Sequence, residues 1–307
     1  MKRLAILLIA AVTMAVSCSS GSTDTTAAAA TTTTSVVATT TTTMPPTTTA
    51  APTTTVVPAT AAPTTTVVTT APEGDVEPLV FVAFGDSVIS YPEPSEAVIG
   101  AYAAILEEEF GRPVLIRNSA VGGSTPTQLL DALAHGPAQA DLAKADVVLL
   151  EIPLGDTNPA FPTAVGMQGR DPADCGGDDH QQCLRDYVPE NKASVEAIYA
   201  ALTAICDPSE TLIRALDTYV LHVEDQHESG TLHITKPYIQ ETRDFLHETA
   251  AGYGIPVARV YDEFMGPDGT DDPRDRGLVM TDQRHPTEAG ALLIAEMLHD
   301  LGYDLAS

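Results

Sequence analysis

The chain has 307 residues, of which 44% are hydrophobic, and 42 acidic side chains oppose only 15 basic ones, so its formal net charge is −27. A field of this sign repels phosphate backbones, which argues against a nucleic-acid partner. The acidic excess falls almost wholly within residues 75–307, and a segment of that length is enough for a single α/β domain.

The first seventeen residues have the pattern of a targeting signal. Lys2 and Arg3 precede an apolar run over residues 4–16, which is too short to span a bilayer stably. The run ends in AVSC, residues 15–18, which resembles the lipobox of bacterial lipoproteins, although Leu is more common than Ala at its first position. The resemblance implies cleavage before Cys18, lipidation of Cys18 and anchoring at the extracellular face of the cell membrane. The alternative is an ordinary cleaved signal peptide and a secreted protein.

Residues 18–74 consist almost entirely of Thr, Ala, Pro, Val and Ser and contain no aromatic residue. Such a composition cannot bury enough apolar surface to offset the entropy lost on ordering. We therefore expect a disordered linker, a candidate for O-glycosylation, between the N-terminal signal and a folded domain at residues 75–307.

Apolar runs alternate with segments of helical spacing along this domain. Strands that are near-continuous apolar runs indicate a parallel sheet covered on both faces. The pattern predicts an α/β fold, a three-layer α/β/α sandwich with about five parallel strands. Predicted strands cover residues 79–87, 113–123 (with the loop that follows), 145–153, 211–223 and 255–264; predicted helices cover 100–111, a short stretch from Thr125, 189–206, 236–254 and 286–302.

The first candidate motif, Gly85-Asp86-Ser87, ends the first predicted strand. Active sites of parallel sheets lie at the carboxyl ends of the strands, and a helix starting there offers backbone N–H groups to an anion. A serine after an aspartate is also commonly a simple helix cap.

The second motif, residues 282–286 (DQRHP), precedes the last predicted helix. A spacing of three lets the Asp282 carboxylate fold back onto the His285 imidazole and fix its tautomer, which leaves the other ring nitrogen free to accept a proton. A capped helix with an exposed histidine is the alternative for this motif taken alone.

Together, a GDS after the first strand and a D-x-x-H-P before the last helix resemble the SGNH (GDSL-like) hydrolase family. NSAVGGST (118–125) resembles its second block, and HPTEAGALLIAEML its ending, so the resemblance extends over residues 81–298. It implies a flavodoxin-like fold and a serine esterase that acts without a metal or another cofactor. In that mechanism Ser87 is the nucleophile, His285 its base and Asp282 the residue that orients the imidazole.

The resemblance also implies an oxyanion hole made by the N–H groups of Ser87 and Gly123 and by the side chain of Asn158. The third block departs from the family pattern G-x-N-D, because residues 155–158 read GDTN and place the asparagine one position late. An ionised Asp156 in its place cannot donate a hydrogen bond.

Three cysteines lie in the domain, and in an oxidising compartment one disulfide and one free thiol are the simplest arrangement. Both Cys175–Cys183 and Cys183–Cys206 remain open. The acidic segments 174–180 and 268–275 lack EF-hand spacing, so we expect solvated loops and no metal. The long irregular segment 159–189 follows the third strand, and we hypothesise that it sets substrate selectivity. We expect the remaining histidines to be surface residues without a role: His222, His227, His233 and His247.

The sequence therefore favours a monomeric, lipid-anchored esterase acting on short or medium acyl esters, or on acetylated glycans. Transfer of the acyl group to a sugar hydroxyl is one alternative. The other is a degenerate hydrolase fold used for surface binding, which the shifted GDTN favours and the intact Ser87, Asp282 and His285 oppose.

Overall fold

The computed structural model describes residues 66–67, 76–93, 97–135, 137–153 and 176–305, all within one compact unit, Ala59–Ser307. The predicted signal, Cys18 and nearly all of the predicted linker lie outside these residues. None of the helices within the described ranges is long and apolar enough to cross a membrane.

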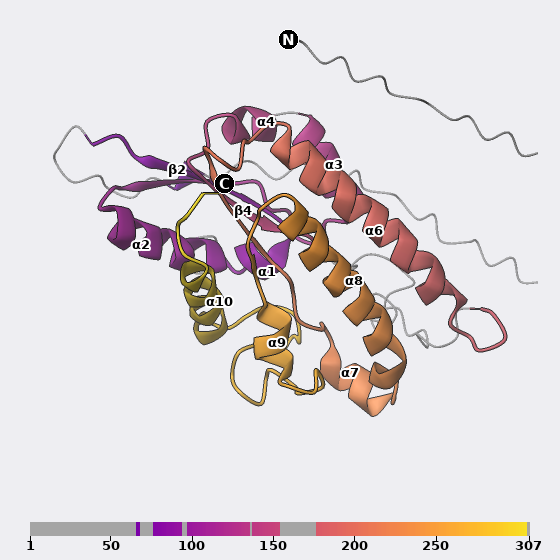
Figure 1. The fold of residues 1–307 in the computed structure, drawn as a ribbon. Helices are drawn as coiled ribbons and strands as arrows, with labels where there is room; N and C mark the ends of the chain where they lie inside the picture. Colours follow the sequence, from indigo (N-terminus) through magenta and orange to yellow (C-terminus); the bar gives the residue numbers. More distant parts are fainter. Residues whose placement is uncertain (1–65, 68–75, 94–96, 136, 154–175, 306–307) are drawn as a thin grey trace, which may run out of the picture. The chain divides into compact units, whose positions relative to one another are not determined.

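A parallel sheet of five strands forms the centre of the unit and confirms the predicted fold class (Figure 1). The strand order β3-β2-β4-β5-β6 puts the first strand of the domain in the interior of the sheet, next to β4. At one edge, two residues of the predicted linker range, Thr66–Val67 (β1), pair antiparallel with β3. The five parallel strands are β2 Leu79–Phe84, β3 Val114–Asn118, β4 Val147–Glu151, β5 Leu212–Leu216 and β6 Val257–Ala258.

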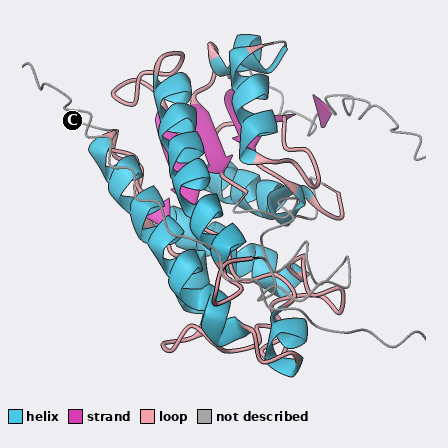
Figure 2. Cartoon of the chain, turned by 90° about the vertical axis from the view of Figure 1, so that its right-hand side faces the viewer, coloured by secondary structure: helices cyan, strands magenta, loops and turns pink. Residues whose placement is uncertain are grey.

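Helices cover both faces of the sheet, because alternate side chains of each strand point to opposite sides. In β2, Phe81 and Ala83 join one apolar core, whereas Val82 and Phe84 join the other. α2 packs against α10 on the first face and α6 packs against α3 and α8 on the second (Figure 1). Figure 2 shows the strands flanked by helices. The described helices are α1 Ser87–Ser90, α2 Val98–Phe110, α3 Pro126–Ala134, α4 Pro137–Leu142, α6 Gln182–Thr203, α7 Val223–Glu228, α8 Leu232–Gly252, α9 Val260–Met265 and α10 Glu288–Asp300.

Local sequence signals place several helix ends correctly. Thr125 caps α3 through a reciprocal pair of hydrogen bonds with Gln128, and Pro126 occupies the first turn as expected. Gly111 ends α2 in a left-handed conformation that glycine adopts at little cost.

Two strand predictions are too long. β5 ends at Leu216, and the buried apolar residues after it form a loop and the start of α7. The predicted strand 255–264 contributes only Val257–Ala258 to the sheet, and α9 follows at once. In α9 the residues at helical spacing, Val260, Phe264 and their neighbours, are the buried ones.

Two helices begin earlier than their prolines suggested. α6 starts at Gln182 and contains Pro189, so the end of the predicted loop 159–189 is helical. α8 starts at Leu232 and contains Pro237. Each proline removes one helical hydrogen bond, but buried residues before it, such as Leu184 and Leu232, keep the first turns packed.

The cysteines settle one of the two open pairings. Cys183 is in a disulfide, whereas Cys206 is a buried free thiol that contacts the carbonyl of Leu142. The Cys183–Cys206 alternative is therefore wrong. Cys175 lies outside the described residues.

Candidate active site

Ser87 is the first residue of α1, directly after the carboxyl end of β2, where the sequence predicted it. Asp86 is buried, and its Oδ1 accepts the N–H of Val88 at 2.7 Å, which fixes the start of the helix. The N–H of Asp86 donates to Oε2 of Glu151, at the end of the adjacent β4, at 2.8 Å. The turn that carries Ser87 is thus held from both sides.

Gly85 allows this turn to pass close to Glu151. Its φ is +156°, and a Cβ at this position would lie 2.6 Å from Oε2 of Glu151 and 2.9 Å from Cδ1 of Ile89. Only a residue without a side chain fits there, which explains the glycine of the GDS motif.

A tight turn after β3 lies beside Ser87. Ser124 donates its N–H to the carbonyl of Val121, and Gly123 between them has a φ of +69°, as in a type II turn. The carbonyl of Gly85 accepts the N–H of Val121 at 3.0 Å, which joins this turn to the Ser87 turn. A Cβ at Gly122 would lie 3.5 Å from the Cβ of Ser87, so the turn with the predicted Gly123 approaches Ser87 through Gly122, which the sequence did not indicate.

His285 and Asp282 form the predicted contact. Nδ1 of His285 lies 2.6 Å from Oδ2 of Asp282, and Oδ1 of Asp282 accepts the N–H groups of Arg284 and His285. Burial alone would raise the pKa of Asp282, but these hydrogen bonds, with that from His285 first, outweigh burial and lower it. The carboxylate is therefore ionised near neutral pH and holds the Nδ1 edge of the imidazole.

Tyr91 connects the histidine with the helix of Ser87. Its ring stacks on the His285 imidazole with the centroids 4.0 Å apart and the planes at 27°. Its N–H donates to the carbonyl of Ser87 at 3.0 Å. The sequence motifs gave no indication of this residue, since the contact joins parts of the chain that are far apart.

The segment after β5 supports residues 282–286, which we call the histidine loop. His222 donates its N–H to the carbonyl of Gln283 at 3.0 Å, and Nε of Arg284 lies 2.7 Å from Nε2 of His222. The side chain of His222 is only 12% exposed, so the expectation of a surface residue was wrong. Tyr219 donates its Oη to the carbonyl of Arg284 at 2.5 Å.

Tyr219 also lies in the electrostatic field of three carboxylates near the histidine loop. Burial raises its pKa well above the ordinary value for a phenol, and the carboxylates of Asp86, Asp282 and Glu151 raise it further. The residue therefore stays protonated and can act only as a neutral donor to the loop backbone.

Comparison with known proteins identifies the family. Residues 83–293, more than half of the chain, match the model of the GDSL-like lipase/acylhydrolase family. The protein belongs to this family. It is accordingly a carboxylic ester hydrolase, as the sequence motifs predicted.

Solved structures share the fold of this GDSL-like hydrolase at low sequence identity. The lipase Lip_vut3 from a goat rumen metagenome is 17% identical, with a TM-score of 0.57 over 75% of this chain and 100% of that chain. A catalytic mutant of Axe2, an acetylxylan esterase from Geobacillus stearothermophilus, is 12% identical, with a TM-score of 0.52 over 74% and 95%. LAE5, an alpha/beta hydrolase enzyme from the metagenome of Lake Arreo in Spain, is 15% identical, with a TM-score of 0.50 over 72% and 94%. Among curated proteins, none matches this chain.

Two predictions for this GDSL-like hydrolase concern residues that the structure does not describe. Asn158 lies outside the described residues, as does most of the loop proposed to set selectivity. Within the described ranges, no group of three or more His, Cys, Asp or Glu side chains could hold a metal ion.

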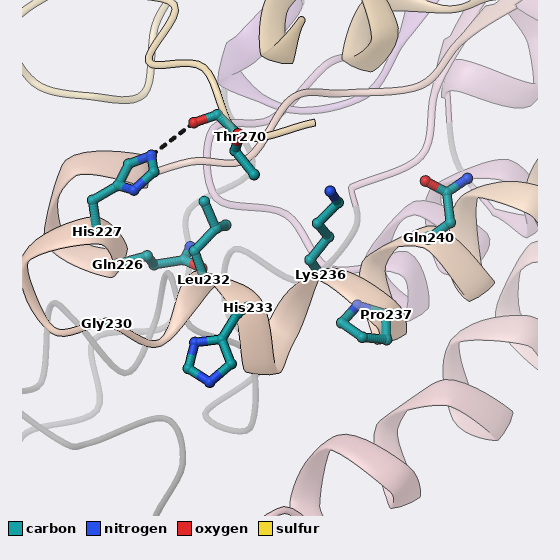
Figure 3. Close-up of a pocket in the computed structure, with 9 residues that line it drawn as sticks. All are labelled: Gln226, His227, Gly230, Leu232, His233, Lys236, Pro237, Gln240 and Thr270. Atoms are coloured by element: carbon teal, nitrogen blue, oxygen red, sulfur yellow. Dashed lines mark hydrogen bonds between the residues drawn. The ribbon is translucent and has the colours of Figure 1, made fainter. Parts of the chain in front are cut away.

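A hollow of about 520 Å³ lies between α7, α8 and the loop after α9 (Figure 3). His227, which is exposed, turns to the carbonyl of Thr270 at 2.7 Å, and the exposed His233 lines the same hollow. Both are surface residues, as expected.

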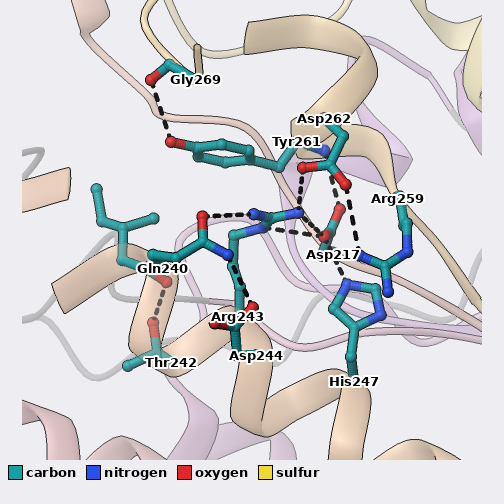
Figure 4. Close-up of polar contacts among 11 residues, drawn as sticks. Asp217, Gln240, Thr242, Arg243, Asp244, His247, Arg259, Tyr261, Asp262 and Gly269 are labelled. Carbon is teal, nitrogen blue, oxygen red and sulfur yellow. Dashed lines mark hydrogen bonds and ion pairs between the residues drawn. The ribbon is translucent and has the colours of Figure 1, made fainter. Parts of the chain in front are cut away.

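His247, by contrast, belongs to a polar network around Asp217, the residue that follows β5 (Figure 4). Oδ2 of Asp217 accepts hydrogen bonds from Nε2 of His247 and from Nε and Nη2 of Arg243, at 2.8–3.0 Å. Oδ1 of Asp217 accepts the N–H of Tyr261, and Nη2 of Arg243 also contacts Asp262 at 2.9 Å. The expectation of a surface histidine was therefore wrong for His247, and the network joins β5, α8 and α9.

Proposed function

We propose that this GDSL-like hydrolase is a serine esterase that works through an acyl-serine intermediate. Oγ of Ser87 attacks the ester carbonyl and passes its proton to Nε2 of His285. The C–O bond to the alcohol breaks, and the alcohol leaves with that proton. Water then attacks the acyl-serine with His285 again as the base, which releases the acid and restores Ser87.

The contact of His285 with Asp282 at 2.6 Å is the observation that carries this proposal. A carboxylate on Nδ1 directs the other nitrogen outward and stabilises the imidazolium that forms during attack. Tyr91, stacked on His285 and hydrogen-bonded to the carbonyl of Ser87, supports bringing base and nucleophile to one corner of the sheet.

The oxyanion hole in this proposal uses the N–H groups of Ser87 and Gly123 and the side chain of Asn158. As the first helical residue, Ser87 has an N–H that its own helix cannot satisfy. The close approach of Gly122 to Ser87 supports a donor from the same turn. Each such donor is typically worth about 10²- to 10³-fold in turnover.

We further propose short or medium acyl esters, including acetylated glycans, as the substrate class, and a monomer that needs no cofactor. Hydrolysis of p-nitrophenyl esters from acetate to palmitate tests the reaction. We expect Ser87→Ala to lower kcat/KM by about 10³-fold or more, and Ser194→Ala on α6 to leave it unchanged.

Covalent labelling separates the possible reasons for a negative result. A fluorophosphonate should add its mass to the peptide that contains Ser87, both in the unmodified protein and in Ser194→Ala. The Ser87→Ala variant should take up no label. A folded protein that neither hydrolyses any ester nor takes up the label would contradict the proposed mechanism. A transferred acyl group on an added sugar would indicate acyl transfer instead.

The lipobox-like sequence at residues 15–18 supports a lipid anchor on Cys18, facing the cell exterior. We expect the protein expressed with residues 1–307 to partition into the detergent phase of Triton X-114, and its Cys18→Ala variant to stay in the aqueous phase. Equal partitioning of the two proteins would contradict lipidation of Cys18.

A further inference from the structure

A groove lined mostly by apolar side chains lies between the first turns of α2 and α10, next to the histidine loop. Its volume of about 610 Å³ falls within the range of about 300–1,000 Å³ that is usual for small-molecule sites. Pro92, which follows Tyr91, and Pro286, which follows His285, both line it. Two residues of the lining are therefore the chain neighbours of the stacked pair of Tyr91 and His285. Its described lining is Pro92, Ala97, Gly100, Ala101, Ala104, Met280, Pro286, Glu288, Ala291 and Leu292.

The lining favours an uncharged apolar ligand. Glu288 is the single charged residue among the described lining residues, and it would repel a carboxylate. Small side chains on α2 make the hollow, and Leu292 of α10, which also lines it, is 48% exposed. An alkyl chain in the groove would cover this open apolar surface.

The sheet order indicates which part of an ester lies on this side. The turn with Gly122 and Gly123 follows β3, on one side of β2, whereas the histidine loop docks on the segment after β5, on the other side. In the proposed mechanism the carbonyl oxygen faces the glycine turn, and the leaving oxygen lies within hydrogen-bonding reach of His285. The alcohol portion of the ester therefore extends towards the groove.

We propose that this groove binds an apolar alcohol portion of the substrate, so that within the substrate class proposed above the enzyme prefers esters of alkyl alcohols over acetylated glycans. The inference deepens the proposed function and rests on it for the assignment of the alcohol side. Each methylene placed in the groove should raise kcat/KM by about two- to fourfold, until the groove is filled.

Two ester ladders test the assignment: alkyl acetates from ethyl to decyl, which vary the alcohol, and p-nitrophenyl esters, which vary the acyl chain. Ala104→Leu fills the groove at an exposed position of α2. We expect it to lower the ratio of kcat/KM for octyl acetate to that for ethyl acetate by at least about tenfold. Ala101→Leu, one turn earlier in α2, should make kcat/KM stop rising at a shorter alcohol chain. Ala200→Leu, exposed on α6, is the matched control and should keep the ratio.

Calorimetric titration with 1-octanol tests the groove without any reaction. We expect binding to the unmodified protein and to Ala200→Leu, and weaker binding to Ala104→Leu. If octanol binds but no ester is hydrolysed, the result would contradict the proposed function and support the groove as a binding site for alkyl chains. Absence of octanol binding, or a change in the acyl ladder instead of the alcohol ladder with Ala104→Leu, would overturn the inference.

Discussion

Replacing Arg243 by methionine should destabilise the protein strongly, because Arg243 neutralises a carboxylate that has no access to water. The side chains of Asp217 and Arg243 are 0% and 1% exposed, and the guanidinium donates to Asp217 from both Nε and Nη2. Methionine has a similar shape but removes the guanidinium, so that among the described residues His247 and the N–H of Tyr261 remain as donors to Asp217. Removing one partner of a buried pair typically costs about 3–5 kcal/mol. For a domain of this size, that corresponds to a fall in Tm of about 6–20 °C.

Arg259→Met is a matched control for this prediction. Arg259 is 62% exposed and contacts Asp262, another carboxylate of the same network, at 3.5 Å. An exposed pair of this kind is worth less than about 1 kcal/mol. Urea unfolding followed by circular dichroism at 222 nm measures both variants. The reasoning would be refuted if Arg243→Met lost no more free energy of unfolding than Arg259→Met.

Substitutions at three further positions address the active site. Asp282→Asn should keep the fold but lower kcat by about 10²- to 10⁴-fold, because an amide does not stabilise the imidazolium; an undiminished kcat would count against the proposed role. Tyr91→Leu should lower kcat by about three- to tenfold with little change in KM, because it removes the aromatic face from protonated His285, whereas Tyr91→Phe should retain it; equal losses would indicate packing alone. Gly85→Ala should lower the free energy of unfolding by about 1–3 kcal/mol, since its Cβ meets Glu151, and an unchanged urea midpoint would contradict that contact.

The parts of the site that the sequence predicts are those held by local geometry. Asp282 and His285 are three residues apart and meet through one turn of the chain, so their spacing alone indicates the contact. Ser87 follows a strand whose apolar run is evident, and the carboxyl end of that strand sets its position.

Tyr91 and His222 escape sequence reasoning because their partners are brought close only by the tertiary fold. Tyr91 meets His285 from the opposite end of the domain, and His222 meets Arg284, which follows it by 62 residues in the chain. Nothing in their immediate neighbours distinguishes them from surface residues.

The errors in the strand ends have a related cause. Residues after β5, including Tyr219, Val220 and Leu221, are as buried as the strand itself because they pack beneath the histidine loop. An apolar run therefore continues after the backbone has left the sheet. Periodicity reports burial, and burial is not restricted to strands and helices at the base of an active site.

The proposed nucleophile and base lie near opposite ends of the folded domain, since Ser87 follows β2 and His285 precedes α10. Under the proposed mechanism, a chain that is still being synthesised or exported carries the serine long before it carries the imidazole. The catalytic pair then exists only once β5 has joined the sheet and α10 has docked on α2. By this mechanism the growing chain therefore hydrolyses no ester until His285 has been synthesised and folded into place beside Asp282.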